Sequence, residues 1–335
     1  HTRTRRQRQM CIRDRAHTDR PASETSHPIV VIGAGLAGAV AARLLADHGF
    51  DVVVLDKGRR VGGRCSRRAL DDVVVTHGAR HVHDWPEWMK AWCDGENTVM
   101  VQDGSTTSLR LMDGPETIAG WLNGIDVVTG TTVVRIEQSD DQWHVHDEEG
   151  NRWEATGVVV TAPLPQLHRM MPGAPESWSN HAYRPTWSLV LAHGTPPPAA
   201  FRPTLENLGF EVEESDGTTG AVVHFPHDWS QSHLEDERTD VVQAFMDMTS
   251  GVDNEVLDWL KSATCQSHRW RYGRADALGV KSAFPCLVEA GDAWETPVGT
   301  GGAALRSGAW AAAHMAWQCS QHLRPASAPV QQTLF

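Results

Sequence analysis

The 335-residue sequence lacks the signals that would place it in a membrane, around a metal ion or in a disulfide framework. No apolar run approaches the roughly 20 residues that span a bilayer. The six cysteines are scattered and none forms a CxxC pair, which argues against a zinc site or redox pair and favours a reducing, cytoplasmic location. There is no HExxH motif and no catalytic triad. The net charge of −12 disfavours binding to nucleic acid or to anionic membranes.

One stretch near the beginning of the chain has a pattern typical of nucleotide binding. Apolar residues 29–32 predict a buried strand, an Ala- and Leu-rich segment predicts a helix to about His48, and residues 52–55 predict a second strand. The turn reads GAGLAG, a GxGxxG motif, and an acid ends the second strand. Glycines allow backbone to approach a pyrophosphate, a helix N-terminus favours phosphate, and the acid accepts hydrogen bonds from a ribose. The predicted contacts are Gly33, Gly35, Ala37, Gly38 and Asp56.

A second glycine motif follows at once and distinguishes flavin from nicotinamide cofactors. Lys57 is followed by GRRVGGR, which ends at Arg64. An NAD-binding domain has no need of GGR at this position, whereas the flavoprotein group that includes amine oxidases carries one after its second strand. The chain resembles that group here. The resemblance implies that Lys57, Arg64 and neighbouring N–H groups help to hold the pyrophosphate of FAD.

The carboxyl-terminal part of the sequence holds a second segment with features of a cofactor-binding site. Residues 286–290 predict a strand that ends in Gly291-Asp292, and a glycine-rich segment then opens a helix of small residues to about Trp317. The aspartate is expected to accept hydrogen bonds from ribitol or phosphate groups. The start of the helix, at Gly301, Gly302 and Ala303, is expected to direct N–H groups at the flavin O2 region and to stabilise the reduced ring.

The sequence between these halves predicts a β-meander and a second domain. Meander strands are expected between residues 126 and 161, further strands at 188–192, 220–225 and 264–270, and helices at 165–171, 240–249 and 254–262. The predicted organisation is a disordered or artefactual extension at 1–27, an FAD-binding domain built from 28–67, 116–165 and 284–320, a substrate domain built from 68–115 and 166–283, and a loose tail at 321–335.

Several segments together resemble renalase and its bacterial relatives, and the resemblance covers residues 29–320. They are DKGRRVGGRCSRR (56–68), THGAR (76–80), AVVHFPHDWSQSHLED (221–236), HRWRYGRAD (268–276) and EAGDAW (289–294). The resemblance implies an α/β fold with a GR2-type, p-hydroxybenzoate-hydroxylase-like Rossmann FAD-binding domain and a mixed α+β substrate domain. It also implies non-covalent FAD, with backbone near Val133 facing the adenine. The implied reaction is oxidation of 2- or 6-dihydro-NAD(P), with hydride transfer to flavin N5 and reoxidation by O2 to hydrogen peroxide.

The substrate pocket is less well defined, because the chain departs from the family at residues 80–83 and 294–297. Candidate pocket residues are His224 at a strand end, Arg80 and Trp294. The RWR sequence at 269–271 either braces the domains or meets a substrate phosphate. His77, His81 and His83 have no evident carboxylate or cysteine partner, so no metal site is predicted.

Two other interpretations remain open. The first is an amine oxidase or desaturase relative that oxidises a C–N or C–C bond of another small molecule. The second is a non-catalytic flavin-binding protein, a hypothesis motivated by the altered segment 80–83. A plain NAD-dependent dehydrogenase would need neither the GGR sequence nor the terminal glycine-rich helix.

Overall fold

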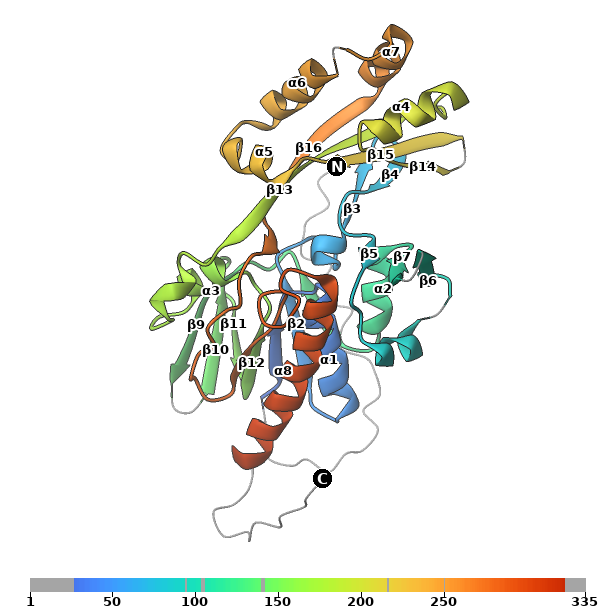
Figure 1. Ribbon diagram of the computed structural model, residues 1–335. Coiled ribbons are helices and arrows are strands. Elements are labelled where there is room, and N and C mark those ends of the chain that lie inside the picture. Colours follow the sequence, from blue (N-terminus) through green and yellow to red (C-terminus); the bar gives the residue numbers. More distant parts are fainter. Residues whose placement is uncertain are drawn as a thin grey trace, which may run out of the picture.

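The computed structural model describes residues 27–322 except 94, 104–105, 140–141, 216 and 250. The predictions for residues 1–26 and 323–335 therefore lie outside the described residues. Figure 1 shows an elongated molecule with a parallel sheet at one end and an antiparallel sheet at the other, connected by two long strands. The prediction of an α/β fold, with a Rossmann-like parallel sheet and a second mixed part, is confirmed.

The first sheet has five parallel strands in the order β17-β12-β1-β2-β8. Its strands are β1 (Ile29–Ile32), β2 (Val52–Asp56), β8 (Asp126–Thr129), β12 (Gly157–Val160) and β17 (Leu287–Glu289). The central strands β1 and β12 are buried along their whole length, as expected for a parallel sheet covered on both faces. This sheet is assembled from segments at both ends of the described chain.

Two helices lie side by side against this sheet, α1 (Leu36–Asp47) and α8 (Gly301–His322). Their close approach depends on Gly308, where a Cβ would lie 2.4 Å from the carbonyl oxygen of Ala37. The meander strands β9 (Val133–Ser139), β10 (Gln142–Asp147) and β11 (Arg152–Ala155) join the same apolar core, to which Ile136 and Trp143 contribute.

The second sheet is antiparallel, in the order β14-β15-β13-β16. Its strands are β13 (Tyr183–His193), β14 (Glu211–Ser215), β15 (Thr218–His224) and β16 (Thr264–Ala275). One face packs Trp187, Leu189 and Val223 into a core with α5 (His227–Ser232), α6 (Arg238–Met248) and α7 (Asn254–Ser262). The other face meets the hairpin of β3 (Arg67–Leu70) and β4 (Val73–Thr76).

The remaining elements are short. They are β5 (His81–Val82), β6 (Thr98–Asp103), β7 (Thr106–Leu111), α2 (Gly114–Trp121), α3 (Leu164–Met170) and α4 (Arg202–Asn207), with 3-10 turns between them. The helix at 254–262 lies where it was predicted, whereas β13 and β16 are both longer than predicted. The strand β14 and the helix α4 were not predicted.

Candidate functional site: a nucleotide cradle beneath a histidine-lined sheet

The glycine turn between β1 and α1 has the tight geometry that its sequence predicts. Gly33 has a φ of +103°, and a Cβ there would lie 2.3 Å from Oγ1 of Thr161. A Cβ on Gly38 would lie only 1.8 Å from the carbonyl oxygen of Gly33. The Thr161 hydroxyl donates to the carbonyl oxygen of Ile32 at 2.9 Å and so fixes the end of β12 to the turn. No side chain fits at Gly33 or Gly38, because backbone and Thr161 occupy that space.

Asp56 lies at the end of β2 and braces this turn. One carboxylate oxygen accepts the N–H of Ala34 and the other accepts the N–H of Gly58, each at 2.6 Å. Each carboxylate oxygen has a second acceptor site. Asp56 can therefore hold the turn and still accept hydrogen bonds from a ribose, the contact predicted for it.

The GGR segment docks against the glycine turn through bare backbone. Gly62 has a φ of +128°, and its N–H donates to the carbonyl oxygen of Ala34 at 2.8 Å. A Cβ on Gly63 would lie 3.1 Å from Cα of Gly35, so a side chain would fill the gap between the two loops. Gly63 and Lys57 are exposed beside the start of α1. Two facing glycines, a helix N-terminus and a lysine form a cradle that fits an anionic pyrophosphate.

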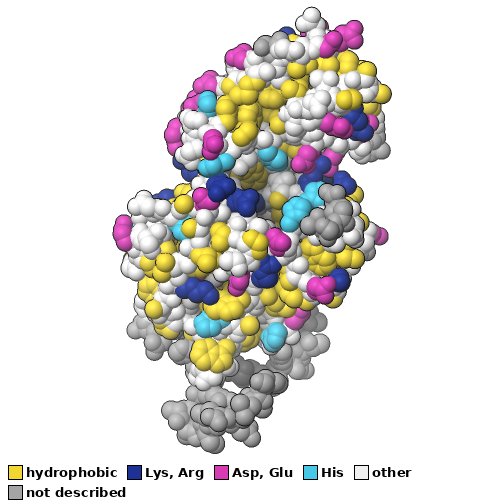
Figure 2. Space-filling model, viewed as in Figure 1, with side chains coloured by type: hydrophobic (Ala, Val, Ile, Leu, Met, Phe, Trp, Pro, Cys, Tyr) yellow, Lys and Arg dark blue, Asp and Glu magenta, His cyan; other side chains and the backbone are white. Residues whose placement is uncertain are grey.

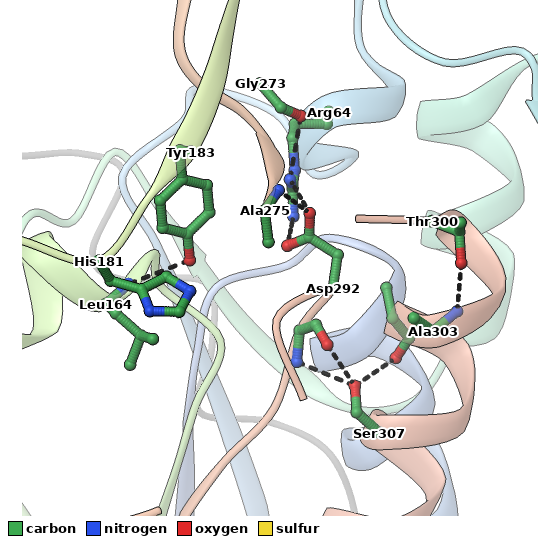
Figure 3. A network of polar contacts seen from close by, with 12 residues as sticks. Arg64, Leu164, His181, Tyr183, Gly273, Ala275, Asp292, Thr300, Ala303 and Ser307 are labelled. Carbon is green, nitrogen blue, oxygen red and sulfur yellow. Dashed lines mark hydrogen bonds and ion pairs between the residues drawn. The ribbon is translucent and has the colours of Figure 1, made fainter. Parts of the chain in front are cut away.

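Arg64 and Asp292 connect the two ends of the described chain (Figure 3). The guanidinium donates to both oxygens of Asp292, at 2.8 and 2.7 Å, and also to the carbonyl oxygen of Gly273 at 3.1 Å. Asp292 further accepts the N–H of Ala275 at 2.8 Å. The carboxylate therefore joins the GGR loop, the strand β17 and the end of β16. The sequence predicts that Arg64 faces the pyrophosphate and that Asp292 faces ribitol or phosphate groups, and the structure adds a direct bond between the two residues.

The electrostatics of this pair favour its charged form. Burial alone would raise the pKa of Asp292, but Arg64 and the N–H of Ala275 outweigh it and hold the pKa below its usual value. For Arg64, burial opposes the charged form, and the Asp292 carboxylate outweighs that effect and raises the pKa of the guanidinium. Tyr183 lies close by, with its hydroxyl oxygen accepting the N–H of Leu164 at 3.2 Å. Burial, and then Asp292, raise the pKa of Tyr183 to about 12.

The N-terminus of α8 is more occupied than the sequence suggested. The N–H of Ala303 donates to Oγ1 of Thr300 at 3.0 Å, so Thr300 caps the helix and the buried Ala303 does not direct its N–H at a ligand. A Cβ on Gly302 would lie 2.2 Å from the carbonyl oxygen of Asp84, because the 83–84 backbone covers this glycine. Only Gly301 of the predicted trio remains half-exposed. Gly291 lies just after β17, and its N–H donates to Oγ of Ser307 in α8 at 2.9 Å.

Two further predicted cofactor contacts are core positions. Ala37 is 5% exposed and its carbonyl lies under Gly308 of α8. Val133, also 5% exposed, begins β9 and pairs with Asp147 of β10. Their side chains stabilise the fold, and any contact with a nucleotide would have to come from their backbone.

A polar and aromatic cluster occupies the face of the antiparallel sheet that the helices leave uncovered. Ser188 of β13 is paired with His224 of β15 on one side and with His268 of β16 on the other, so the three side chains share a face. Trp270 follows two residues after His268 on that face, and its ring stacks on His77 with centroids 5.3 Å apart. Figure 2 shows histidine and arginine side chains gathered around a recess between the two halves of the molecule.

His77 links this cluster to the nucleotide cradle. It follows β4 directly, and the next residue, Gly78, lies so close to the backbone of Arg64 that a Cβ would be 2.2 Å from the carbonyl oxygen. The imidazole is 3% exposed, and its Nδ1 has no hydrogen-bond partner. Burial, and then the neighbouring His268, Arg68 and His224, lower the pKa of His77 to about 3. His77 is therefore neutral in the native protein at ordinary pH.

This buried neutral histidine predicts a pH-dependent stability. Below pH 6.5 the unfolded chain binds a proton at His77 and the native protein does not, so stability is complete above that pH and falls as the pH drops towards 3. The loss between pH 7 and pH 5 should be about 2 kcal/mol, at a slope of at most ~1.4 kcal/mol per pH unit. His77→Phe should remove this component, as measured by urea unfolding at both pH values. His48→Phe, at an exposed position, controls for loss of an imidazole as such, and an unchanged slope in His77→Phe would contradict the assignment.

Of the three predicted pocket residues, Arg80 lies near enough to His224 to add to the effect of burial in lowering the pKa of its imidazole, whereas Trp294 lies apart from them in the core. Arg80 is 7% exposed and lies 2.7 Å from Glu213 of β14, so its guanidinium fastens the turn after β4 to that strand and is not free for a substrate. Trp294 is 8% exposed and packs edge-to-face against Trp178 in the core. His224 alone keeps an exposed side chain.

The RWR sequence braces its own part of the molecule. Arg271 makes a bidentate ion pair with Glu235, both distances being 2.7 Å. Arg269 lies over the Trp187 ring and donates to the carbonyl oxygen of Leu234 at 2.6 Å. Both arginines therefore hold the segment between α5 and α6 against β16.

Ser188, His77 and His268 were missed as a group, because only the register of three strands brings Ser188 and His268 to one face. Within the described ranges, no three His, Cys, Asp or Glu side chains are placed to hold a metal ion. In the same residues, no helix combines the length and apolar character needed to cross a membrane.

Together, the glycine turn, the acid at the end of β2 and the parallel sheet define a Rossmann-like domain, here joined to an antiparallel sheet. Residues 31–94 match the family model described as an NAD(P)-binding Rossmann-like domain. A solved structure of a putrescine oxidase double mutant, made in a redesign of its cofactor binding, has the same fold, with a TM-score of 0.61 and 12% sequence identity. The match covers 87% of this chain and 99% of that one.

Curated relatives match over short segments only. The chain is 50% identical over 50 residues to a zeta-carotene-forming phytoene desaturase of Myxococcus xanthus, which is 15% of this chain and 10% of the desaturase. It is 50% identical over 44 residues to an L-amino-acid oxidase of Mus musculus, covering 12% and 7% of the two chains. It is 52% identical over 46 residues to a flavin-containing monooxygenase of Arabidopsis thaliana, covering 14% and 10%. The matched segments thus span a tenth or less of these relatives.

Proposed function

We propose that the protein is a non-covalent FAD-dependent oxidase of the renalase-like kind, which takes a hydride from 2- or 6-dihydro-NAD(P) and uses O2 as the final electron acceptor. The observation that carries the proposal is the bond between Arg64 and Asp292. This bond joins the GGR loop to the Gly-Asp segment after β17. A domain that binds only NAD needs neither the GGR loop nor that segment. The matches to flavin-containing and oxidase relatives support a flavin as the cofactor.

The residues of the cradle have distinct tasks in this proposal. The glycine turn, the start of α1 and Lys57 would hold the pyrophosphate, Asp56 the adenosine ribose, and the Arg64–Asp292 pair the ribityl chain. Bound FAD would supply a hydride acceptor at N5, with two electrons then passing to O2 to give hydrogen peroxide. The protein's own part is to orient the substrate ring and exclude water, because a dihydronicotinamide already carries a transferable hydride. The rings of His77, His268 and Trp270, which pack on one another, would form an aromatic wall beside such a ring.

An anaerobic absorption spectrum tests this function. NADH partly isomerised with borohydride is added to the purified protein under nitrogen, and ordinary NADH serves as the matched control. We expect rapid bleaching of the flavin bands by the isomers, then recovery with stoichiometric hydrogen peroxide when air is admitted. Bound flavin that the isomers cannot bleach would contradict the substrate assignment.

A second candidate is oxidation of an amine, which the structural likeness to a putrescine oxidase favours. Bleaching by putrescine or by an L-amino acid, without bleaching by dihydronicotinamide isomers, would select it. Flavin that no reductant of either kind bleaches would select a non-catalytic flavin-binding protein.

A further inference from the structure

The polar cluster on the antiparallel sheet contains a directed chain of hydrogen bonds that ends at the exposed His224. Nε1 of Trp270 donates to Oγ of Ser188 at 3.1 Å, and Oγ of Ser188 lies 2.7 Å from Nδ1 of His224. The indole can only donate. Ser188 is fully buried, and the described residues offer its hydroxyl proton no other acceptor than His224. The direction of the second bond is thereby determined.

Only one arrangement of protons satisfies all three groups. If Nδ1 of His224 carried the proton, Ser188 would accept twice and its own buried hydroxyl proton would be unpaired, which costs about 1–3 kcal/mol. If Ser188 donates instead, Nδ1 is the acceptor, and the neutral imidazole carries its proton on Nε2. His224 is exposed while its Nδ1 is held by a buried serine, so Nε2 is the nitrogen left for another partner. Glu211 and Arg80 are the charged groups that act on this imidazole.

We propose that the Trp270–Ser188 pair is a positioning device that fixes His224 as an outward Nε2–H donor, and that this donor binds a planar amide carbonyl of the substrate. With the proposed function, on which this identification rests, the acceptor is the carboxamide oxygen of the dihydronicotinamide. We call the hydrogen-bonded series Trp270–Ser188–His224 the relay. At its Trp270 end the indole ring stacks on His77, which connects the relay to the GGR loop. A continuous series of contacts thus runs from His224 through Trp270 and His77 to the loop that carries Arg64.

The relay is tested first in the resting protein, without any substrate. Long-range ¹H–¹⁵N correlation spectra of the ¹⁵N-histidine-labelled protein at neutral pH, assigned by loss of a signal in His224→Gln, should show His224 with its proton on Nε2 and an acceptor Nδ1. Trp270→Phe keeps the ring but removes the indole donor, and should give a mixture of tautomers. Trp143→Phe, which removes an indole N–H bonded to the carbonyl oxygen of Pro285 in the core of the parallel sheet, should leave the His224 signal unchanged. A proton on Nδ1 of His224 in the wild-type protein would overturn the relay.

The role of the donor is tested by a pair of substitutions that separate the two nitrogens. Glutamine places an amide N–H near the position of Nε2, and asparagine places one near Nδ1. We expect His224→Gln to keep KM for the isomerised NADH within about threefold of wild type, and His224→Asn to raise it at least tenfold, both with flavin bound as before. Equal effects of the two substitutions on KM would overturn the assignment of the His224 Nε2–H as the donor to the substrate. If the tautomer result holds while no dihydronicotinamide is oxidised, the relay stands and the proposed substrate falls.

Discussion

Gly38→Ala is expected to abolish FAD binding and to destabilise the protein by about 3 kcal/mol. Alanine usually stabilises a helix relative to glycine. At this position, however, the added methyl group would lie 1.8 Å from the carbonyl oxygen of Gly33 and 3.0 Å from its carbonyl carbon. The clash is with backbone on the turn that forms the cradle, so it cannot be relieved by a side-chain rotation. Flavin content per protein and urea unfolding measure the two effects.

The matched control is Gly120→Ala in α2. Gly120 is also helical, and nothing lies within 4 Å of the Cβ that would be added. The same substitution should there stabilise the protein by about 0.5–1 kcal/mol, with flavin content unchanged. A Gly38→Ala protein that binds FAD normally would show that the close packing of this turn is not needed for the cradle.

Asp292→Ala is expected to cost about 3 kcal/mol of stability and most of the bound FAD. The substitution leaves the guanidinium of Arg64 and the N–H of Ala275 without their shared acceptor in a buried place, and breaking a buried ion pair costs about 3–5 kcal/mol. We take the lower end because the Arg64 side chain retains 36% exposure, and solvent screens the pair on that side. Asp292→Asn, which keeps one acceptor oxygen, should be intermediate.

The same pair gives a pH signature. The pKa of Asp292 is lowered in the native protein, so its contribution is complete above the ordinary value of about 3.9 and is lost as the pH falls through the native pKa. Asp292→Asn should not show this loss of stability at acidic pH. Asp276→Ala is the control, because it breaks an exposed pair with Arg184 just after β16, and should change stability by no more than about 0.5–1 kcal/mol. An Asp276 effect as large as that of Asp292 would contradict the role of burial.

The glycine turn and the elements around it were predictable because their signals are local. Strand, glycine turn, helix and acid lie within residues 29–56, and each follows from the conformational needs of neighbouring residues. The bond between Arg64 and Asp292 joins residues 228 positions apart, and pattern reasoning placed both at the cofactor without showing that they meet. Ala303 was misjudged for a local reason, since Thr300 caps the helix and takes its N–H.

The antiparallel sheet was harder to predict, because β13 contains a proline and β16 a glycine, and both residues usually interrupt or weaken a strand. The strand β13 extends past Pro185, which lies at an irregularity in the pairing between Arg184 and Thr186. Gly273 likewise lies inside β16, where a Cβ would be 2.9 Å from the carbonyl oxygen of Arg184. The shared face of Ser188, His224 and His268 depends on the register of three strands, which no single segment reveals.

The most direct test of the account is the visible absorption spectrum of the purified protein, taken as isolated and after incubation with FAD and gel filtration, with the released cofactor identified by mass spectrometry. We predict the two absorption bands of oxidised flavin and release of intact FAD on heating, which would also show that the cofactor is not covalently bound. A colourless protein that retains no FAD after reconstitution, or that retains NAD instead, would contradict the cradle and the oxidase built on it.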